Sequence, residues 1–290
     1  MNIKASLLTA ALVVLFTAVA LPGSLRAQGF SDIAGLFTES FQDAIDLLPP
    51  DVTSIRIGVG PAIYPEYMGD DRYKIQAAPV VSLRYRNLFE IDNNELKITA
   101  LSGLLDTNTN IGKGKLRFGP LVSLDFGRKA KRSNDLIGFG NVSTSVELGA
   151  FVGYAVGPVR LRLRARHDVA GGHSGAIVKG DVALALYRDS KLALGSNLST
   201  TWASSKYMKS YFGVSATQSA GSGLTVFTPG SGIRDLAVGA SANYLISRNF
   251  SVVSSLRYAR LMSGAKKSPL VKTRGSANQV SFSSYIIYSF

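Results

Sequence analysis

The chain has 290 residues, 46% of them hydrophobic, and carries a formal net charge of +13. This length suffices for a large core or a large barrel. The absence of cysteine excludes a disulfide framework, a thiol nucleophile and a thiolate metal site. The positive charge is typical of a protein that contacts nucleic acid or, alternatively, anionic lipid and sugar phosphate.

Residues 1–27 have the pattern of a secretory signal peptide. Lys4 provides a positive start, residues 5–21 form an apolar run, and cleavage is expected before Gln28. Cleavage after Ala20 is an alternative with better small-residue spacing. An uncleaved anchor is a third option, although the run is short for a membrane span. Because an exported chain has little access to nucleic acid, we expect no nucleic-acid partner.

Residues 28–50 differ from the rest of the chain and predict a periplasmic amphipathic helix that ends at Pro49-Pro50. Its apolar stripe should be buried, and three places remain open: a partner protein, the inner leaflet or the mouth of a barrel. Acidic charge disfavours the leaflet. The stripe comprises Ile33, Leu36, Phe37, Phe41, Ile45 and Leu48, and the carboxylates between them are Asp32, Glu39, Asp43 and Asp46.

From Asp51 onward, polar and apolar residues alternate with the period of two that is typical of β-strands. After the signal, no segment offers the roughly 18 apolar residues that a spanning helix needs, so a membrane-integrated chain must be a closed barrel. Twelve strands are predicted, near 53–62, 73–85, 88–92, 95–105, 114–127, 143–155, 159–169, 176–188, 192–202, 235–247, 250–261 and 279–290.

The predicted fold is all-β, an antiparallel transmembrane β-barrel of about 12 strands over residues 51–290, with 10 strands if the weak 88–92 strand and a neighbour are dropped. The strands of a soluble barrel also alternate between polar and apolar residues. Here, however, nearly every predicted strand is long enough to span, and the polar face carries many small residues, as a crowded lumen requires. The last strand ends on Phe290, which with Tyr288 is typical of the signal that assembles outer-membrane barrels.

An even number of strands places both ends of the barrel in the periplasm of a Gram-negative cell. Short links then lie on the periplasmic side, at 86–87, 157–158, 190–191 and 248–249. Long links lie outside, at 63–72, 128–142, 203–234 and 262–278.

Arginines at alternate positions on the strand 159–169 share one face, which predicts a charged lumen. Two interpretations remain open: a lumen packed with mutually neutralised charge, as in small barrels, or an anion-selective pore. Asp125 is a further partner for the predicted lining charges, which are Arg84, Arg117, Glu147, Arg160, Arg162, Arg164, Arg166, Asp168, Lys179, Asp181 and Arg257.

No catalytic, cofactor or metal site is predicted. The glycines around Val59 and at Gly171-Gly172 lack the spacing of a nucleotide fingerprint. His167, Asp168 and His173 make a thin ligand set on a glycine-rich turn, and no nucleophile elbow accompanies them. We therefore expect a protein that is not an enzyme.

Loop residues add two further features. An aromatic girdle explains Trp202 well, but it explains the neighbouring Tyr207, Tyr211 and Phe212 less well. Bases concentrate in the predicted outside links, where they either contact lipopolysaccharide phosphates or are simply solvated. They are Arg128, Lys129, Lys131, Arg132, Lys206, Lys209, Lys266, Lys267, Lys272 and Arg274.

Several long and unusual stretches resemble the MipA/OmpV family (MltA-interacting protein family) of outer-membrane proteins. The first runs from Trp202 to Leu224 and includes YMKSYFGVS, the second is SPLVK followed by RGSANQ, and the third begins at Gly58 and includes YPEY. The resemblance extends over about residues 55–290 and leaves out the acidic helix. Its motif residues include Trp202, Tyr207, Tyr211, Phe212, Gly213, Pro269, Arg274, Gly275 and Ser276.

The resemblance implies an outer-membrane barrel. For one branch of the family it implies a scaffold that links a membrane-bound lytic transglycosylase, which is a peptidoglycan hydrolase, to a bifunctional murein synthase. Other members resemble osmoregulated or adhesive surface proteins. The residues themselves support the barrel and leave three functions open: a non-enzymatic scaffold, a small pore for anionic solutes, or a surface adhesion barrel.

Overall fold

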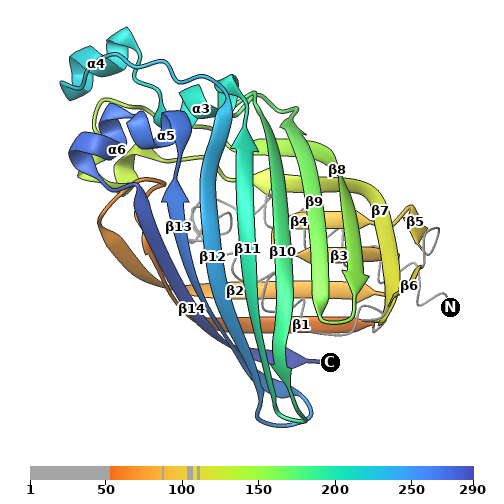
Figure 1. The fold of residues 1–290 in the computed structure, drawn as a ribbon. Coiled ribbons are helices and arrows are strands. Elements are labelled where there is room, and N and C mark those ends of the chain that lie inside the picture. Colours follow the sequence, from red (N-terminus) through yellow and green to blue (C-terminus); the bar gives the residue numbers. More distant parts are fainter. Residues whose placement is uncertain (1–52, 87, 103–106, 110–111) are drawn as a thin grey trace, which may run out of the picture.

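Figure 1 shows one β-sheet closed into a barrel, with short helices gathered at one end. The computed structural model describes residues 53–86, 88–102, 107–109 and 112–290. The predicted signal peptide (1–27) and acidic helix (28–50) lie outside these described residues. Within them, no helix is long and apolar enough to cross a membrane.

The strands are β1 (Ser54–Pro65), β2 (Tyr73–Tyr85), β3 (Phe89–Asp92), β4 (Glu95–Ile98), β5 (Leu101–Ser102), β6 (Thr107–Thr109), β7 (Gly112–Asp125), β8 (Ser145–Val156), β9 (Val159–Asp168), β10 (Ala176–Arg188), β11 (Leu192–Ala203), β12 (Gly232–Leu245), β13 (Phe250–Leu261) and β14 (Asn278–Ser289). The helices are η1 (Ala130–Arg132), η2 (Asn134–Leu136), α3 (Ser205–Phe212), α4 (Ala216–Ser222), α5 (Ser263–Lys267) and α6 (Pro269–Arg274).

Twelve of these strands form a closed ring. They follow one another as β1 to β4 and then β7 to β14, each antiparallel to its neighbours. The ring closes where β14 pairs with β1, and β4 pairs with β7 to complete the other side. β5 and β6 are side strands that pair with β7. The predicted antiparallel barrel of twelve strands is therefore confirmed.

Side-chain exposure alternates along the strands, with apolar residues outside and mostly polar or small residues inside, except for one apolar cluster beside the β1–β14 seam. On β14, Phe282, Ile286 and Phe290 are 40%, 57% and 70% exposed, whereas Ser283 and Tyr285 are each 1% exposed. An apolar outer surface around a charged interior is the polarity of a barrel that spans lipid, and it is the reverse of a soluble barrel. The fold is thus of the outer-membrane type.

The expectation that nearly every strand is long enough to span is wrong for the β3–β4 hairpin. Both strands have four residues, and the predicted strand 95–105 divides into β4 and the two-residue β5. The hairpin turns at Asn93, whose φ of 49° is a left-handed conformation that asparagine tolerates. Val81 of β2 donates to the Asn93 side chain and accepts from its backbone N–H, each at 2.9 Å, and the β2–β3 ladder ends there.

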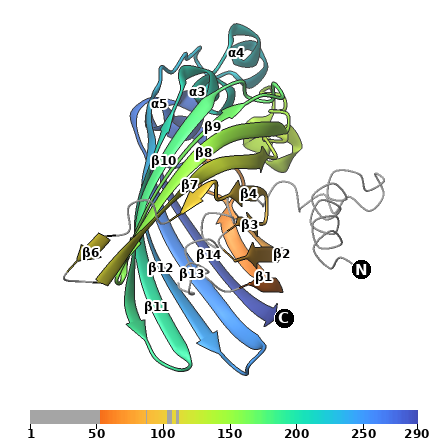
Figure 2. The ribbon, with the colours of Figure 1, turned by 90° about the vertical axis from the view of Figure 1, so that its right-hand side faces the viewer.

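The long links pack into a cap over one mouth of the barrel (Figures 1 and 2). η1 and η2 come from the β7–β8 link, α3 and α4 from the β11–β12 link, and α5 and α6 from the β13–β14 link. Short hairpin links lie at the opposite end, as the alternation of strand directions requires. Two apolar clusters hold the cap. One includes Tyr207, Met208, Tyr211, Phe212 and Val271, and the other Tyr67, Leu136, Phe139, Val214 and Leu270.

The first and last links of the barrel are bonded to each other inside the cap. The Gly69 N–H donates to Gln279 Oε1, and Gln279 Nε2 donates to the Asp70 carbonyl, both at 3.0 Å. The Ser276 N–H donates to the Gly69 carbonyl at 2.9 Å. Gly275 permits this approach, because a Cβ there would lie 1.9 Å from that carbonyl oxygen. The barrel is therefore joined above the β1–β14 seam as well as along it.

A close approach at Gly60 provides a test of the seam. A Cβ at this position would lie 1.9 Å from the Ser284 carbonyl oxygen, so Gly60→Ala must push β1 and β14 apart. We expect it to lower the unfolding free energy by about 1–3 kcal/mol, the usual cost of overpacking. Urea titration followed by heat-modifiable gel mobility measures the change. Gly153→Ala is the matched control, because its Cβ would meet nothing closer than 4.0 Å. Equal losses in the two variants would contradict this account.

Candidate functional site: a charged lumen beneath a packed cap

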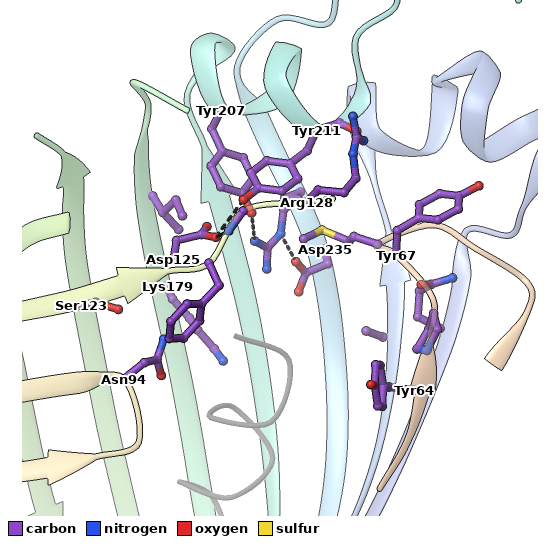
Figure 3. A pocket seen from close by; sticks show the side chains of 18 of the residues that line it. Tyr64, Tyr67, Asn94, Ser123, Asp125, Arg128, Lys179, Tyr207, Tyr211 and Asp235 are labelled. Carbon is purple, nitrogen blue, oxygen red and sulfur yellow. Dashed lines mark hydrogen bonds and ion pairs between the residues drawn. The ribbon is translucent and has the colours of Figure 1, made fainter. Parts of the chain in front are cut away.

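The upper half of the lumen, directly beneath the cap, contains a cavity of about 140 Å³ (Figure 3). Asp125 and Asp235 point into it from the walls, and Tyr207 and Tyr211 close it from above. The other charged lining residues are Glu95, Arg128, Arg132, Glu147, Arg164, Arg166, Lys179, Arg234 and Arg257.

The arginine row of β9 faces inward and is tied to carboxylates on other strands. Arg164 Nη1 lies 3.3 Å from Glu95 on β4, and its Nη2 lies 3.0 Å from Asp181 on β10. Arg162 Nε is 2.6 Å from Asp181, and Arg166 Nη1 is 3.1 Å from Glu95. Each of these buried carboxylates therefore binds two guanidinium groups, and β9 is connected to β4, from which β7 and β8 separate it in the ring.

A second network surrounds the short β3–β4 hairpin. The Glu90 carboxylate lies 3.0 Å from Lys97 Nζ and 3.4 Å from Arg84 Nη2. Lys97 Nζ also approaches Asp92 at 3.3 Å, and Arg117 Nη2 lies 3.9 Å from Glu90. A buried charge is costly unless it is paired and hydrogen-bonded. The hairpin thus supplies carboxylates that balance the cations of the neighbouring walls.

A third network centres on Asp235 near the top of β12. Its carboxylate lies 2.6 Å from Arg234 Nε and 3.3 Å from Arg257 Nη2. Arg234 Nη1 donates to the Tyr207 hydroxyl at 2.8 Å, which connects the lumen to helix α3. A register shift beside Trp202 on β11 interrupts the alternation at this point, so that the adjacent Arg234 and Asp235 are both buried.

His173 lies at the boundary between lumen and cap, and its hydrogen bonds define its tautomer. The Gly175 N–H donates to His173 Nδ1 at 3.0 Å, so the neutral ring carries its proton on Nε2, which lies 3.1 Å from Glu147 Oε1. Asp125 approaches the same nitrogen at 3.9 Å.

Asp125, Glu147 and His173 are close enough to hold a metal ion, but the tautomer of the histidine disfavours one. A ligating Nε2 must offer its lone pair, so the proton of the neutral ring would move to Nδ1 and face the Gly175 N–H. Asp125 also accepts hydrogen bonds from the Tyr211 hydroxyl at 2.9 Å and from a backbone N–H. The cluster is therefore better suited to supporting the cap than to binding metal.

The histidine pair noted in the sequence is not brought together. His167 is exposed on the outer face of β9, whereas His173 is buried inside. Asp168, predicted as a lumen charge, shapes the β9–β10 turn instead. Its carboxylate accepts hydrogen bonds from the backbone N–H groups of Ala170, Gly171, His173 and Ser174.

The other predicted lumen residues lie on the inner faces of their strands. Arg84, Glu147, Arg164, Lys179 and Asp181 are buried, and the rest are partly buried. Arg160 lines a second cavity, of about 220 Å³, near the short links, together with Arg188, Leu184 and Tyr187.

Residues of the family motifs build the cap. Tyr207, Tyr211 and Phe212 belong to its first apolar cluster, so an interfacial girdle does not explain them, whereas Trp202 is exposed on the outer face. Burial raises the pKa of both tyrosines above the ordinary value, so both phenols are protonated at neutral pH: the Tyr211 hydroxyl donates to Asp125, and the Tyr207 hydroxyl accepts from Arg234. Gly213 fits closely, because a Cβ there would lie 2.5 Å from the Lys209 carbonyl oxygen.

The second motif closes the other side of the cap. Pro269 begins α6, where its missing N–H costs nothing. Arg274 Nη1 donates to the Asp135 carbonyl at 2.9 Å. Arg128 was grouped with the exposed loop bases, but it is buried and its Nη1 donates to the Tyr211 carbonyl at 2.7 Å. Burial lowers the pKa of Arg128 to about 10.

Sequence reasoning missed six charged residues of these networks. Four of them alternate through FEIDNNELKI around the Asn93 turn, which is the signal that could have identified them. Asp235 follows the inward alternation of β12, whereas Arg234 is out of phase because of the register shift between β11 and β12. The missed residues are Glu90, Asp92, Glu95, Lys97, Arg234 and Asp235.

Glu95→Gln tests the upper network. The variant removes the charge that Arg164 and Arg166 share, so we expect a loss of about 3–5 kcal/mol in unfolding free energy, measured by urea titration. Glu66→Gln is the control, because Glu66 is in a loop and lies 3.5 Å from Lys74 of β2, which is partly exposed, so losing this pair should cost about 1 kcal/mol or less. A Glu95 variant as stable as the Glu66 variant would overturn the account.

Comparison with the curated proteins gives no match. Among solved structures, the NanC porin is 12% identical with a TM-score of 0.41, covering 82% of this chain and 99% of that one. An outer membrane channel from Pseudomonas putida F1 is 11% identical with a TM-score of 0.40, covering 84% and 97%.

OprB from Pseudomonas putida is 12% identical with a TM-score of 0.36 over 74% of this chain, which spans only 59% of OprB. The family model described as MltA-interacting protein MipA matches residues 57–290, from β1 through the cap motifs to the last residue. A match over this extent shows that the chain belongs to the MipA family.

Proposed function

We propose that this protein is a non-enzymatic barrel of the Gram-negative outer membrane that anchors peptidoglycan enzymes and is exported by a cleaved signal peptide. The family description names an interaction with MltA. The sequence resemblance adds a lytic transglycosylase and a murein synthase as the expected partners. In this role the barrel provides position, because it holds its partners at the inner surface of the outer membrane.

The closed lumen is the observation that carries the proposal. Ion pairs connect walls that are not neighbours, as between Arg164 and Glu95, and the cap packs two apolar clusters over one mouth. Transport requires a continuous wet path, as in large porins, whereas an anchor requires only a stable wall. A paired interior under a packed cap therefore supports anchoring over conduction.

The same contacts support a non-enzymatic role. A catalytic acid or base must present a proton or lone pair to its substrate. Among the described residues, His173 instead has hydrogen-bond partners at both ring nitrogens, and Glu147 lies 2.9 Å from Arg166 Nε. These titratable groups face one another and support the wall.

A periplasmic partner would meet the barrel at the end opposite the cap. Three of the short links there each carry an exposed base: Arg86, Lys191 and Arg248. Like charges at the rim attract an acidic partner surface and set the rate of encounter more than the final affinity. We therefore assign the partner contact to this basic rim.

A capture assay tests the anchor. Immobilised full-length protein in detergent should retain purified MltA, and the triple variant Arg86→Glu, Lys191→Glu, Arg248→Glu should retain severalfold less, because the rim becomes acidic. The matched control Lys206→Glu, Lys209→Glu, Lys272→Glu changes the same charge on the cap and should behave as the unmodified chain. Absence of capture by the unmodified chain would refute the anchor.

The second candidate function is a pore for small anions. It is favoured by the upper cavity, because its lining has seven lysine and arginine side chains and only four carboxylates. Planar bilayer recording separates the two functions, because a stable anion-selective current through the full-length protein would favour the pore.

A separate proposal concerns the outer face of the cap, where Lys206, Lys209, Lys266, Lys267 and Lys272 are all exposed. Their spacing on α3, α5 and α6 suits contact with lipopolysaccharide phosphates. The cap triple variant should therefore lose lipopolysaccharide binding severalfold in a salt-dependent manner, whereas the rim triple variant should retain it. Unchanged binding by the cap variant would contradict this contact.

A further inference from the structure

We infer that the acidic segment 31–48 of the same chain docks inside the barrel, between an apolar wall and an arginine wall. The inference is independent of the anchor proposal. It rests on the two-sided character of the lumen, on the two-sided pattern of the segment and on where the described chain begins.

One wall of the lumen is apolar. A lumen of a membrane barrel is normally polar, so a continuous apolar patch on its inner surface calls for an apolar partner. The patch lies on β1, β2, β13 and β14, on both sides of the closing seam. Its members form one buried cluster: Ala62, Tyr64, Ala78, Val80, Val253, Tyr285 and Ile287.

The facing wall is basic, because its four arginines outnumber Glu95, Glu147 and Asp181, the carboxylates that pair with three of them. In the ring of twelve strands, β9 is separated from β1 by five strands in one direction and from β14 by four in the other, so it lies across the lumen from the apolar patch. Its inward side chains are Arg160, Arg162, Arg164 and Arg166. Arg84, Arg117 and Arg188 lie within electrostatic range of Arg160 and repel it, whereas Glu90 attracts it.

Residues 31–48 show the complementary pattern. At about 100° per residue, the stripe that includes Ile33, Phe37 and Phe41 falls on one side of a helix, and all four carboxylates, including Glu39 and Asp43, fall on the opposite side. A helix in this orientation places its stripe on the apolar wall and its carboxylates towards the β9 arginines. In this position the apolar stripe is buried and the carboxylates lie near cations.

Length and attachment also fit. A helix of 18 residues is about 27 Å long, which is comparable to the thickness of a bilayer core. Only residues 49–52 separate it from Thr53, the first described residue, at the short-link end of β1. Eleven-stranded cans already accommodate a central helix, so a ring of twelve is wide enough. The cavity beside Arg160 and Arg188 lies at this same end.

Planar bilayer recording is the first test. The variant lacking residues 28–48 should conduct severalfold more than the full chain, and a synthetic peptide of residues 31–48 should close it again. A peptide of the same composition with the apolar spacing scrambled should not. Equal conductance with and without the segment, in a deletion variant that still shows heat-modifiable mobility, would overturn the inference.

A second test does not depend on conductance. The chain has no cysteine, so a single Phe41→Cys reports on that residue alone. It should react severalfold more slowly with a water-soluble maleimide in the folded protein than after unfolding in urea, whereas the control Gly230→Cys, at an exposed position where a Cβ meets nothing within 4 Å, should react at nearly equal rates in both. Rapid labelling of the folded Phe41→Cys protein would refute docking in the lumen. Protection that appears only after MltA is added would assign the segment to the partner instead.

Discussion

The rest of the structure depends on the pairing of charge inside the barrel. A guanidinium group that a strand turns away from lipid enters an interior of low dielectric, where an unpaired charge costs several kcal/mol. On β9 an arginine faces the lumen at every second residue. Carboxylates on other strands pair with these arginines: Glu95 on β4, Glu147 on β8 and Asp181 on β10. Strands distant in the ring thus depend on one another, and the wall is fixed by charge within as well as by backbone hydrogen bonds.

The cap obeys a different principle but is connected to the same networks. Its helices are held by apolar clusters, and its underside is polar. Arg234 reaches up from the Asp235 network to the Tyr207 hydroxyl, and His173 links Glu147 to the same tyrosine through an edge-on ring contact at 4.9 Å. A run of aromatic residues in a loop therefore forms the core of the cap, because its side chains point into the molecule.

The sequence predicts the strands well because lipid outside and charge inside impose one simple alternation on the chain. Every wall strand from β7 to β14 follows this rule over ten or more residues. Prediction fails where local geometry breaks the alternation. The β3–β4 hairpin is short because Asn93 turns the chain after four residues, and the register shift near Trp202 buries both Arg234 and Asp235.

The candidate site is less predictable than the wall, because its contacts join residues far apart in the chain. No local pattern shows that Arg128 would be buried against the carbonyl of Tyr211, which lies 83 positions away. The arginine row was evident from spacing alone, whereas its carboxylate partners depend on which strands lie near β9 in the ring.

The hydrogen bonds between Gly69 and Gln279 bear on the order of folding. Their residues are 210 positions apart, so the contact cannot form until the last strand has been delivered to the first. Contacts of such long range form late, because the entropy of closing the intervening loop must be overcome first. The cap is therefore completed only after the barrel has closed. In an incompletely assembled barrel the links of the cap are unpacked and accessible to the proteases of the cell envelope.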